Sequence, residues 1–206
     1  MIFIFDLDDT LIDNIKLKIA LAKIFRFSYS EFTASRKKYF AKDNDLYSPF
    51  EHVKMLYKEG EISARQKENY LIGINKLTKK INIFLFPESI RLLKNLRKRN
   101  ENLILLTHGN VKWQKCKLEN LSIKRFFNKI IVANKDKTKV LKFFKKKDEI
   151  VFINDNAKEN LAIKRLLPKA EVILIDGPRI DNALHKEKIF KLKEIVRKYE
   201  IEKTKN

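Results

Sequence analysis

The sequence predicts an α/β protein built on a doubly wound parallel sheet, with a helical segment inserted after the first strand. Three observations support this fold class. Short apolar runs recur along the chain, segments with helical spacing separate them, and one long stretch near the N-terminus is helical in pattern throughout. Runs that are apolar on both faces and alternate with helices are typical of a parallel sheet covered on both sides. Such a sheet is the core of doubly wound domains.

The predicted strands are the short apolar runs. One begins the chain and four lie in its second half, and each has the length of a buried strand. In chain order they are Ile2 to Phe5, Leu103 to Leu106, Ile130 to Ala133, Ile150 to Ile153 and Val172 to Ile175.

The predicted helices of this sheet domain follow from apolar residues three or four positions apart. Three such sets occur, namely Ile90, Leu93 and Leu96, then Val140, Leu141 and Phe144, and finally Ile189, Leu192, Val196 and Tyr199. Because these sets lie between or after the strand runs, we expect their helices to cover the sheet.

Residues 14–85 break the alternation of strands and helices. Their pattern is helical, and turn signals such as Ser48-Pro49 and Glu59-Gly60 divide it. Pro87, followed by an amphipathic pattern, marks the return to the sheet domain. We therefore predict a core domain of residues 1–13 and 86–206, and an inserted helical domain of residues 14–85.

Composition limits the classes of protein. The chain has 206 residues, and no apolar run approaches the roughly 20 residues of a membrane-spanning helix. A single cysteine, Cys116, cannot form an internal disulfide, which fits a reducing compartment. We therefore expect a cytoplasmic protein with no membrane partner; the sequence does not indicate an oligomeric state.

The net charge of +20 raises the question of nucleic-acid binding. The basic residues are spread through nearly every segment, and lysine far outnumbers arginine, whereas base-reading surfaces favour bidentate arginine. We favour a solvated charged surface over a polyanion footprint. The densest cluster, Lys135 to Lys147, is where a footprint would lie.

Polar side chains follow three of the predicted strands. Because ligands bind at the carboxyl ends of the strands in an open parallel sheet, we expect these side chains to converge. They are Asp6 and Asp8 after the first run, Thr107 after the second, and Asn154 and Asp155 after the fourth, with Lys135 and Lys137 at a nearby helix start.

Carboxylates, a hydroxyl and an ammonium at one site favour phosphoryl transfer. An aspartate can attack phosphorus and form an aspartyl-phosphate, and a second one can donate and accept the proton. Mg²⁺ suits carboxylate and phosphate oxygens and would neutralise the like charges. Lysine and threonine would hold the phosphate oxygens as charge develops.

The sequence resembles the haloacid dehalogenase (HAD) superfamily. The first motif of that family, D-x-D-x-T after an apolar strand, is matched by Asp6, Asp8 and Thr10. The second, a Thr or Ser ending a strand, is matched by Thr107. His108 follows it where Asn is common, so His108 becomes a candidate for contact with the phosphate or the leaving group.

The third and fourth motifs also have matches. The third is a lysine near a helix start, for which Lys137 fits better than Lys135 because Lys-Thr leads into an apolar helix. The fourth is an acidic motif after a strand, matched by Asp155. Asn154 stands where many members carry an acid or Gly, and Glu159 is either an outer acid of the site or a solvent-facing residue.

The resemblance implies a phosphatase with a C1-type helical cap and a HAD-like Rossmannoid core. It assigns catalysis to Asp6, Asp8, Thr107 and Lys137, phosphate binding to Thr107, His108 and Lys137, and Mg²⁺ to Asp6, Asp8 and Asp155. In that family, a second acid in the first motif, here Asp8, typifies phosphatases, and helical caps usually accompany small substrates. We therefore expect hydrolysis of a small phosphorylated metabolite such as a nucleotide or sugar phosphate.

Two alternatives stay open. One is a nucleic-acid end phosphatase, which the charge favours and the cap disfavours. The other is a catalytically impaired HAD-fold binding protein, which Asn154 favours and the two motif-one acids disfavour. In the helical insertion, we expect His52 on the surface because its surroundings are helical and charged.

Overall fold

A computed structural model describes residues 1–40, 46–134, 136–144, 149–177 and 189–201. The chain divides into two compact units. The core unit comprises residues 1–13, 85–107 and 122–206, and the helical unit comprises residues 14–84 and 108–121. Residues 108–121, which the sequence pattern assigns to the sheet domain, therefore lie in the helical unit.

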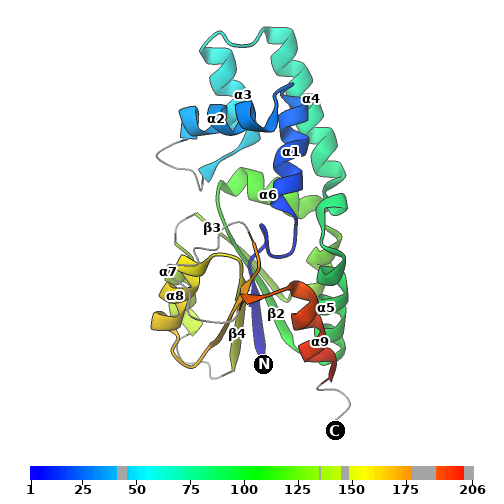
Figure 1. The fold of residues 1–206 in the computed structure, drawn as a ribbon, viewed down its shortest axis with the longest axis vertical. Coiled ribbons are helices and arrows are strands. Elements are labelled where there is room, and N and C mark those ends of the chain that lie inside the picture. The colour runs from blue at the N-terminus through cyan, green and yellow to red at the C-terminus, as the bar shows by residue number, and fades with distance from the viewer. Residues whose placement is uncertain (41–45, 135, 145–148, 178–188, 202–206) are drawn as a thin grey trace. The chain divides into compact units, whose positions relative to one another are not determined.

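In its described residues, the core unit contains a six-stranded sheet and the helices that cover it (Figure 1). Its elements are β1 (Ile2–Phe5), α5 (Pro87–Lys98), β2 (Asn102–His108), η3 (Ser122–Phe126), β3 (Lys129–Ala133), α7 (Lys137–Leu141), η4 (Lys142–Phe144), β4 (Ile150–Asn154), α8 (Ala157–Leu166), β5 (Glu171–Ile175), β6 (Ile189–Phe190) and α9 (Leu192–Ile201).

The strand order is β3-β2-β1-β4-β5-β6, which confirms the predicted doubly wound α/β sheet. β1 pairs in parallel with both neighbours, and Phe5 lies opposite Leu105 on one side and Ile153 on the other. The chain winds outward from β1 in one direction and then returns to begin β4 on its other side. The carboxyl ends of β1 and β4 therefore flank the point where the winding reverses, which is where such sheets bind ligands.

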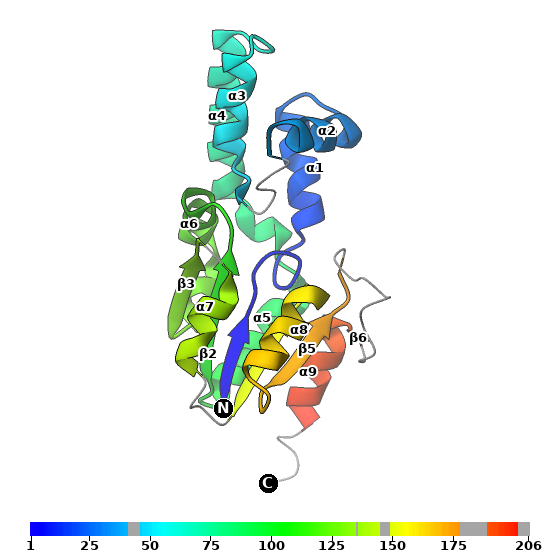
Figure 2. The same ribbon diagram turned by 90° about the vertical axis from the view of Figure 1, so that its left-hand side faces the viewer.

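Alternate residues of β1 face different helices. Ile4 belongs to a buried cluster with Phe152 and with Ile163 of α8. Phe3 points to the other face, where its ring meets Tyr199 of α9 edge-on at 5.0 Å between centroids. Figures 1 and 2 show α7 and α8 on one side of the sheet and α5 and α9 on the other. Helices on both faces explain why the strands are apolar throughout.

The five predicted strands are all present, but the last helical pattern is partly wrong. The spacing places Ile189 in the final helix, whereas Ile189 and Phe190 pair with β5 as β6 and α9 begins at Leu192. A two-residue strand has no periodicity of its own, so sequence spacing could not separate it from the helix.

Apart from His108, which ends β2, the described secondary structure of the helical unit consists of helices joined by turns. Its elements are α1 (Asn14–Ile24), α2 (Tyr29–Phe40), α3 (Pro49–Lys58), α4 (Ala64–Lys79), η2 (Ile81–Phe84) and α6 (Val111–Asn120). Ser63 caps α4 through a reciprocal bond pair with Gln66, in which each side chain accepts from the other residue's backbone N–H. None of the helices in the described part of the chain is long and apolar enough to cross a membrane.

His52 is buried in the helical unit, so the expected surface position is wrong. Its ring is packed among aromatic side chains, and its Nε2 lies 2.8 Å from the hydroxyl of Ser35. The rings with centroids 4.9 to 5.9 Å from its own are those of Phe25, Phe32, Tyr39, Phe40 and Tyr47. Burial, with the nearby Arg36 charge, lowers the pKa of His52 to about 4.

Candidate active site

The loop after β1 places three carboxylates in the core unit. The Asp6 N–H donates to the Ile153 carbonyl at 3.0 Å, which extends the pairing of β1 with β4 by one residue. Asp9 then adopts a left-handed φ of 60°, a conformation that Asp tolerates better than most residues. The chain turns back here, and the Asp9 N–H donates to the Ile12 carbonyl at 2.8 Å. Asp6 and Asp8 are consequently held, buried, at the end of the strand.

Lys137 reaches the same strand end from α7. The helix begins at Lys137 because Asp136 caps it, accepting a bond from the Thr138 N–H at 2.8 Å. The Lys137 Nζ lies 2.8 Å from Asp6 Oδ1 and 2.8 Å from Glu159 Oε2. The structure therefore brings together Asp6 and Lys137, which are far apart in the sequence. Lys135, the alternative lysine, lies outside the described residues.

The charges of this cluster influence one another strongly. Burial raises the pKa of Asp6, and Lys137 opposes that change. Burial alone would lower the pKa of Lys137, but Asp6 and Glu159 outweigh it and raise the pKa. Lys137 is therefore an ammonium at neutral pH, held between two carboxyl groups.

Glu159 belongs to α8, which begins shortly after β4. Asn156 caps this helix by accepting from the Glu159 N–H at 3.1 Å. Asn154 donates from Nδ2 to Glu159 Oε2 at 3.1 Å and to Asn160 Oδ1 at 3.1 Å. Of the two interpretations of Glu159, the structure supports an outer acid of the site, since its carboxylate binds Lys137.

Thr107 and His108 end β2, on the other side of β1 from β4. Thr107 is buried, and its hydroxyl has no hydrogen-bond partner within the described chain. A buried hydroxyl without a partner can bind a ligand oxygen without first breaking another bond. The predicted roles of Thr107 and His108 in phosphate binding stay predictions.

The donors present fit Mg²⁺. Asp6 and Asp155 are buried carboxylates near the ends of paired strands. No group of three or more His, Cys, Asp or Glu side chains suited to a metal occurs among the residues that the structure describes. Mg²⁺ does not need one, because it binds through one or two carboxylates together with substrate oxygens and water. A third ligand from Asp8 stays a prediction.

Gly177, two residues after β5, is a neighbour of Asp155 that the sequence did not reveal. A Cβ atom on Gly177 would lie 3.0 Å from Asp155 Cβ, 3.6 Å from Asp155 Oδ2 and 3.7 Å from the Asp9 carbonyl oxygen. The first distance is too short for an unstrained contact. Glycine therefore leaves room for the Asp155 carboxylate. The signal in the sequence is no more than a glycine just after an apolar run.

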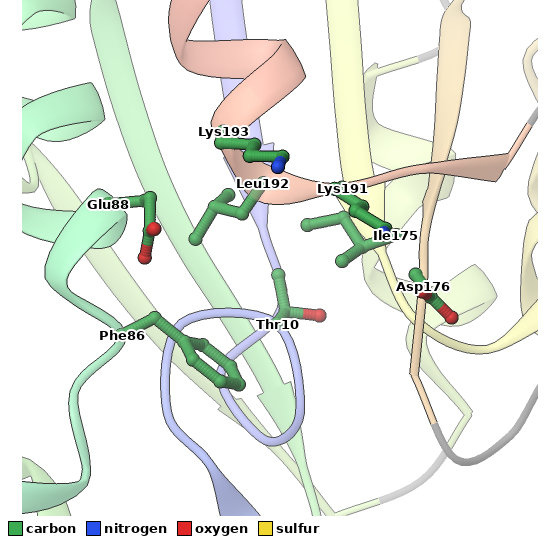
Figure 3. Close-up of a pocket in the computed structure, with 8 residues that line it drawn as sticks. All are labelled: Thr10, Phe86, Glu88, Ile175, Asp176, Lys191, Leu192 and Lys193. Carbon is green, nitrogen blue, oxygen red and sulfur yellow. The ribbon is translucent and has the colours of Figure 1, made fainter.

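A pocket of about 190 Å³ opens elsewhere in the core unit, at the end of β5 (Figure 3). It is lined by Thr10, Phe86, Glu88, Ile175, Asp176, Lys191, Leu192 and Lys193. Two lysines and two acidic side chains give this lining no net charge, so charge does not mark it as an anion site. None of the residues assigned to catalysis lines it.

Comparison with models of known protein families identifies one family. The model for haloacid dehalogenase-like hydrolases matches residues 3–165. The matched span contains Asp6, Thr107, Lys137, Asp155 and Glu159. Comparison with curated proteins gave no significant match.

Solved structures of similar fold cover nearly the whole chain. A provisionally assigned haloacid dehalogenase-like hydrolase from Burkholderia xenovorans LB400 has a TM-score of 0.73 at 15% identity, with 95% of this chain and 94% of that chain covered. A provisionally assigned beta-phosphoglucomutase from Thermotoga maritima has a TM-score of 0.69 at 15% identity, with coverages of 97% and 98%. A provisionally assigned HAD-hydrolase from Bacillus subtilis, YfnB, whose structure has magnesium bound, has a TM-score of 0.62 at 17% identity, with coverages of 96% and 97%. At these identities the likeness shows the fold alone.

Proposed function

The chain belongs to the haloacid dehalogenase-like hydrolase family, and we propose that within it the protein is a Mg²⁺-dependent phosphomonoester hydrolase that forms an aspartyl-phosphate intermediate. The observation that carries this proposal is the position of Lys137, 2.8 Å from Asp6 at the winding reversal of the sheet. A buried carboxylate beside a buried ammonium is suited to attack on a substrate whose anionic oxygens the ammonium then binds.

The proposed reaction has two steps. A carboxylate oxygen of Asp6 attacks phosphorus, and the bond from phosphorus to the ester oxygen breaks while Asp8 donates a proton to the leaving alkoxide. Asp8 then removes a proton from water, whose oxygen attacks the aspartyl-phosphate and releases inorganic phosphate. Lys137 and Thr107 hold the phosphate oxygens in both steps, and His108 is a further candidate for that role.

Asp6 and Asp155 would hold Mg²⁺, which supplies positive charge against the phosphate and the carboxylates when bound. The magnesium in the fold neighbour YfnB supports this choice of metal. Asp8 would be the third protein ligand of the metal in this proposal.

The substrate in this proposal is a small phosphorylated metabolite, with a nucleotide or sugar phosphate as the leading classes. The helical unit would act as a cap that excludes bulk water from the reaction. The beta-phosphoglucomutase assignment of one fold neighbour supports chemistry on phosphorylated compounds. We place the protein in the cytoplasm, in keeping with the free thiol of Cys116.

Hydrolysis of an aryl phosphate tests the proposal. Purified protein should release the phenol with Mg²⁺, and excess chelator should abolish turnover. A parallel assay of halide release from a 2-haloacid tests the other chemistry for which the family is named. Halide release without phosphate-ester hydrolysis would contradict the proposal. A panel of phosphorylated metabolites then identifies the substrate class.

A further inference from the structure

Asn154 connects two parts of the cluster through one amide. Its Nδ2 donates to Glu159 Oε2 and to Asn160 Oδ1, each at 3.1 Å. The same Glu159 oxygen accepts from Lys137 at 2.8 Å, and Lys137 contacts Asp6 at 2.8 Å. A continuous chain of hydrogen bonds therefore leads from Asn160 through Asn154, Glu159 and Lys137 to Asp6.

The charge of Glu159 requires a donor at position 154. If the amide were turned over, Asn154 Oδ1 would face the Glu159 carboxylate and the two oxygens would repel. An aspartate at this position would place a second carboxylate about as far from Glu159 as the amide is now, 3.1 Å. Two carboxylates at such a distance cannot both stay ionised without a large cost. Asparagine satisfies Glu159 without adding charge.

Glu159 needs such an anchor because its side chain is 26% exposed, whereas that of Lys137 is 3% exposed. Without Asn154, the Glu159 carboxylate could turn toward water and leave Lys137 paired with Asp6. Lys137 would then be held by Asp6 alone, and its ammonium would no longer be fixed between two carboxylates.

We propose that Asn154 is a positioning residue that holds Lys137 in place for phosphate binding, acting through Glu159. This proposal rests on the proposed function, in which Lys137 binds phosphate. Asn154 is accordingly not a weakened metal ligand but a specific partner of an acid on α8. The contact with Glu159 accounts for an asparagine at a position where many family members carry an acid or Gly.

Three variants form a charge-exchange cycle. Asn154→Asp places two carboxylates together, Glu159→Gln removes one of them, and the double variant exchanges acid and amide. In the double variant only one carboxylate remains, so the repulsion that Asn154→Asp creates is removed. Because one oxygen, Glu159 Oε2, accepts from both Asn154 and Lys137, the introduced glutamine has to turn its amide so that its nitrogen faces the aspartate and its oxygen faces Lys137. Asn102→Asp is the matched control, because it adds the same charge at an exposed residue that begins β2, at the opposite end of that strand from Thr107.

Two equilibrium measurements and one kinetic measurement are made on wild type and on each variant. Calorimetry gives the affinities for Mg²⁺ alone and for inorganic phosphate in the presence of Mg²⁺, and kinetics give kcat and KM for an aryl phosphate. Asn154→Asp should weaken phosphate binding and lower kcat/KM by about 10- to 100-fold, the loss expected for one charge-assisted hydrogen bond. The double variant should recover most of the phosphate affinity and most of kcat/KM, and Asn102→Asp should match wild type.

Two results would overturn the role of Asn154. One is tighter Mg²⁺ binding together with higher kcat/KM in Asn154→Asp, which would make position 154 a metal ligand. The other is a double variant no better than Asn154→Asp. Should Asn154→Asp not fold, Asn154→Ala removes the donor without adding charge and must still weaken phosphate binding. A wild-type protein that neither hydrolyses phosphomonoesters nor binds phosphate would instead refute the proposed function.

Discussion

Acidification should destabilise the protein through His52. The ring is buried among aromatic side chains, and burial, with the Arg36 charge, lowers the pKa of His52 to about 4. In the unfolded chain the ring titrates near the ordinary value of about 6.5. Between these values the unfolded state binds a proton that the folded state does not. The contribution of neutral His52 to the free energy of unfolding is therefore complete above about pH 6.5 and is lost as the pH falls toward 4.

The size of the effect follows from the two pKa values. Between pH 7.5 and pH 4.5 the His52 contribution to the free energy of unfolding should fall by about 2.5 kcal/mol. The loss should approach about 3.4 kcal/mol once the pH is well below 4, since each pKa unit corresponds to about 1.36 kcal/mol.

Denaturant unfolding of wild type and His52→Gln at several pH values measures this contribution. Glutamine does not titrate, so the difference in pH dependence between the two proteins isolates His52 from the acidic groups. The His52 ring proton, followed by NMR, reports the folded-state pKa directly. Equal loss of stability in both proteins, or a ring that titrates near pH 6.5, would refute the reasoning.

Three further predictions concern the site and the charge. Asp8→Asn should bind phosphate but lose protonation of the leaving group, so alkyl phosphates should suffer more than aryl phosphates; equal losses for both would contradict that role. Gly177→Ala should push Asp155 aside and raise the Mg²⁺ concentration needed for half-maximal activity by about 10-fold or more. An unchanged Mg²⁺ concentration at half-maximal activity would show that Gly177 does not position Asp155. Phosphorylated oligonucleotide ends should be poorer substrates than small phosphomonoesters; a preference for them, with binding that falls steeply as salt rises, would favour the nucleic-acid alternative.

The strands and their polar ends could be predicted because both are local properties. Each apolar run marks a strand, and parallel strands share one edge, so the sequence alone places Asp6, Thr107 and Asp155 at the same edge. The choice of Lys137 depends on the resemblance to a family. Its contact with Asp6 spans 131 positions, which no local pattern contains.

Other features depend on packing that a single sequence does not reveal. His52 has charged neighbours along the chain, but rings from α2, from Phe25 just after α1 and from the segment before α3 enclose it in space. The direction of the Asn154 amide depends on where α8 places Glu159. Gly177 matters because of Asp155, which belongs to another strand end. Of the lysine-rich cluster, residues 136–144 are described, whereas residues 135 and 145–147 lie outside the described residues.

The most direct test of the account is the site of covalent phosphorylation. Wild-type protein mixed with a radiolabelled phosphomonoester and Mg²⁺, then quenched in acid within a single turnover, should carry the label on the peptide that contains Asp6. Asp6→Asn should carry none and should not turn over. Label on another residue, or turnover by Asp6→Asn near the wild-type rate, would contradict the central claim that Asp6 is the nucleophile of a phosphatase.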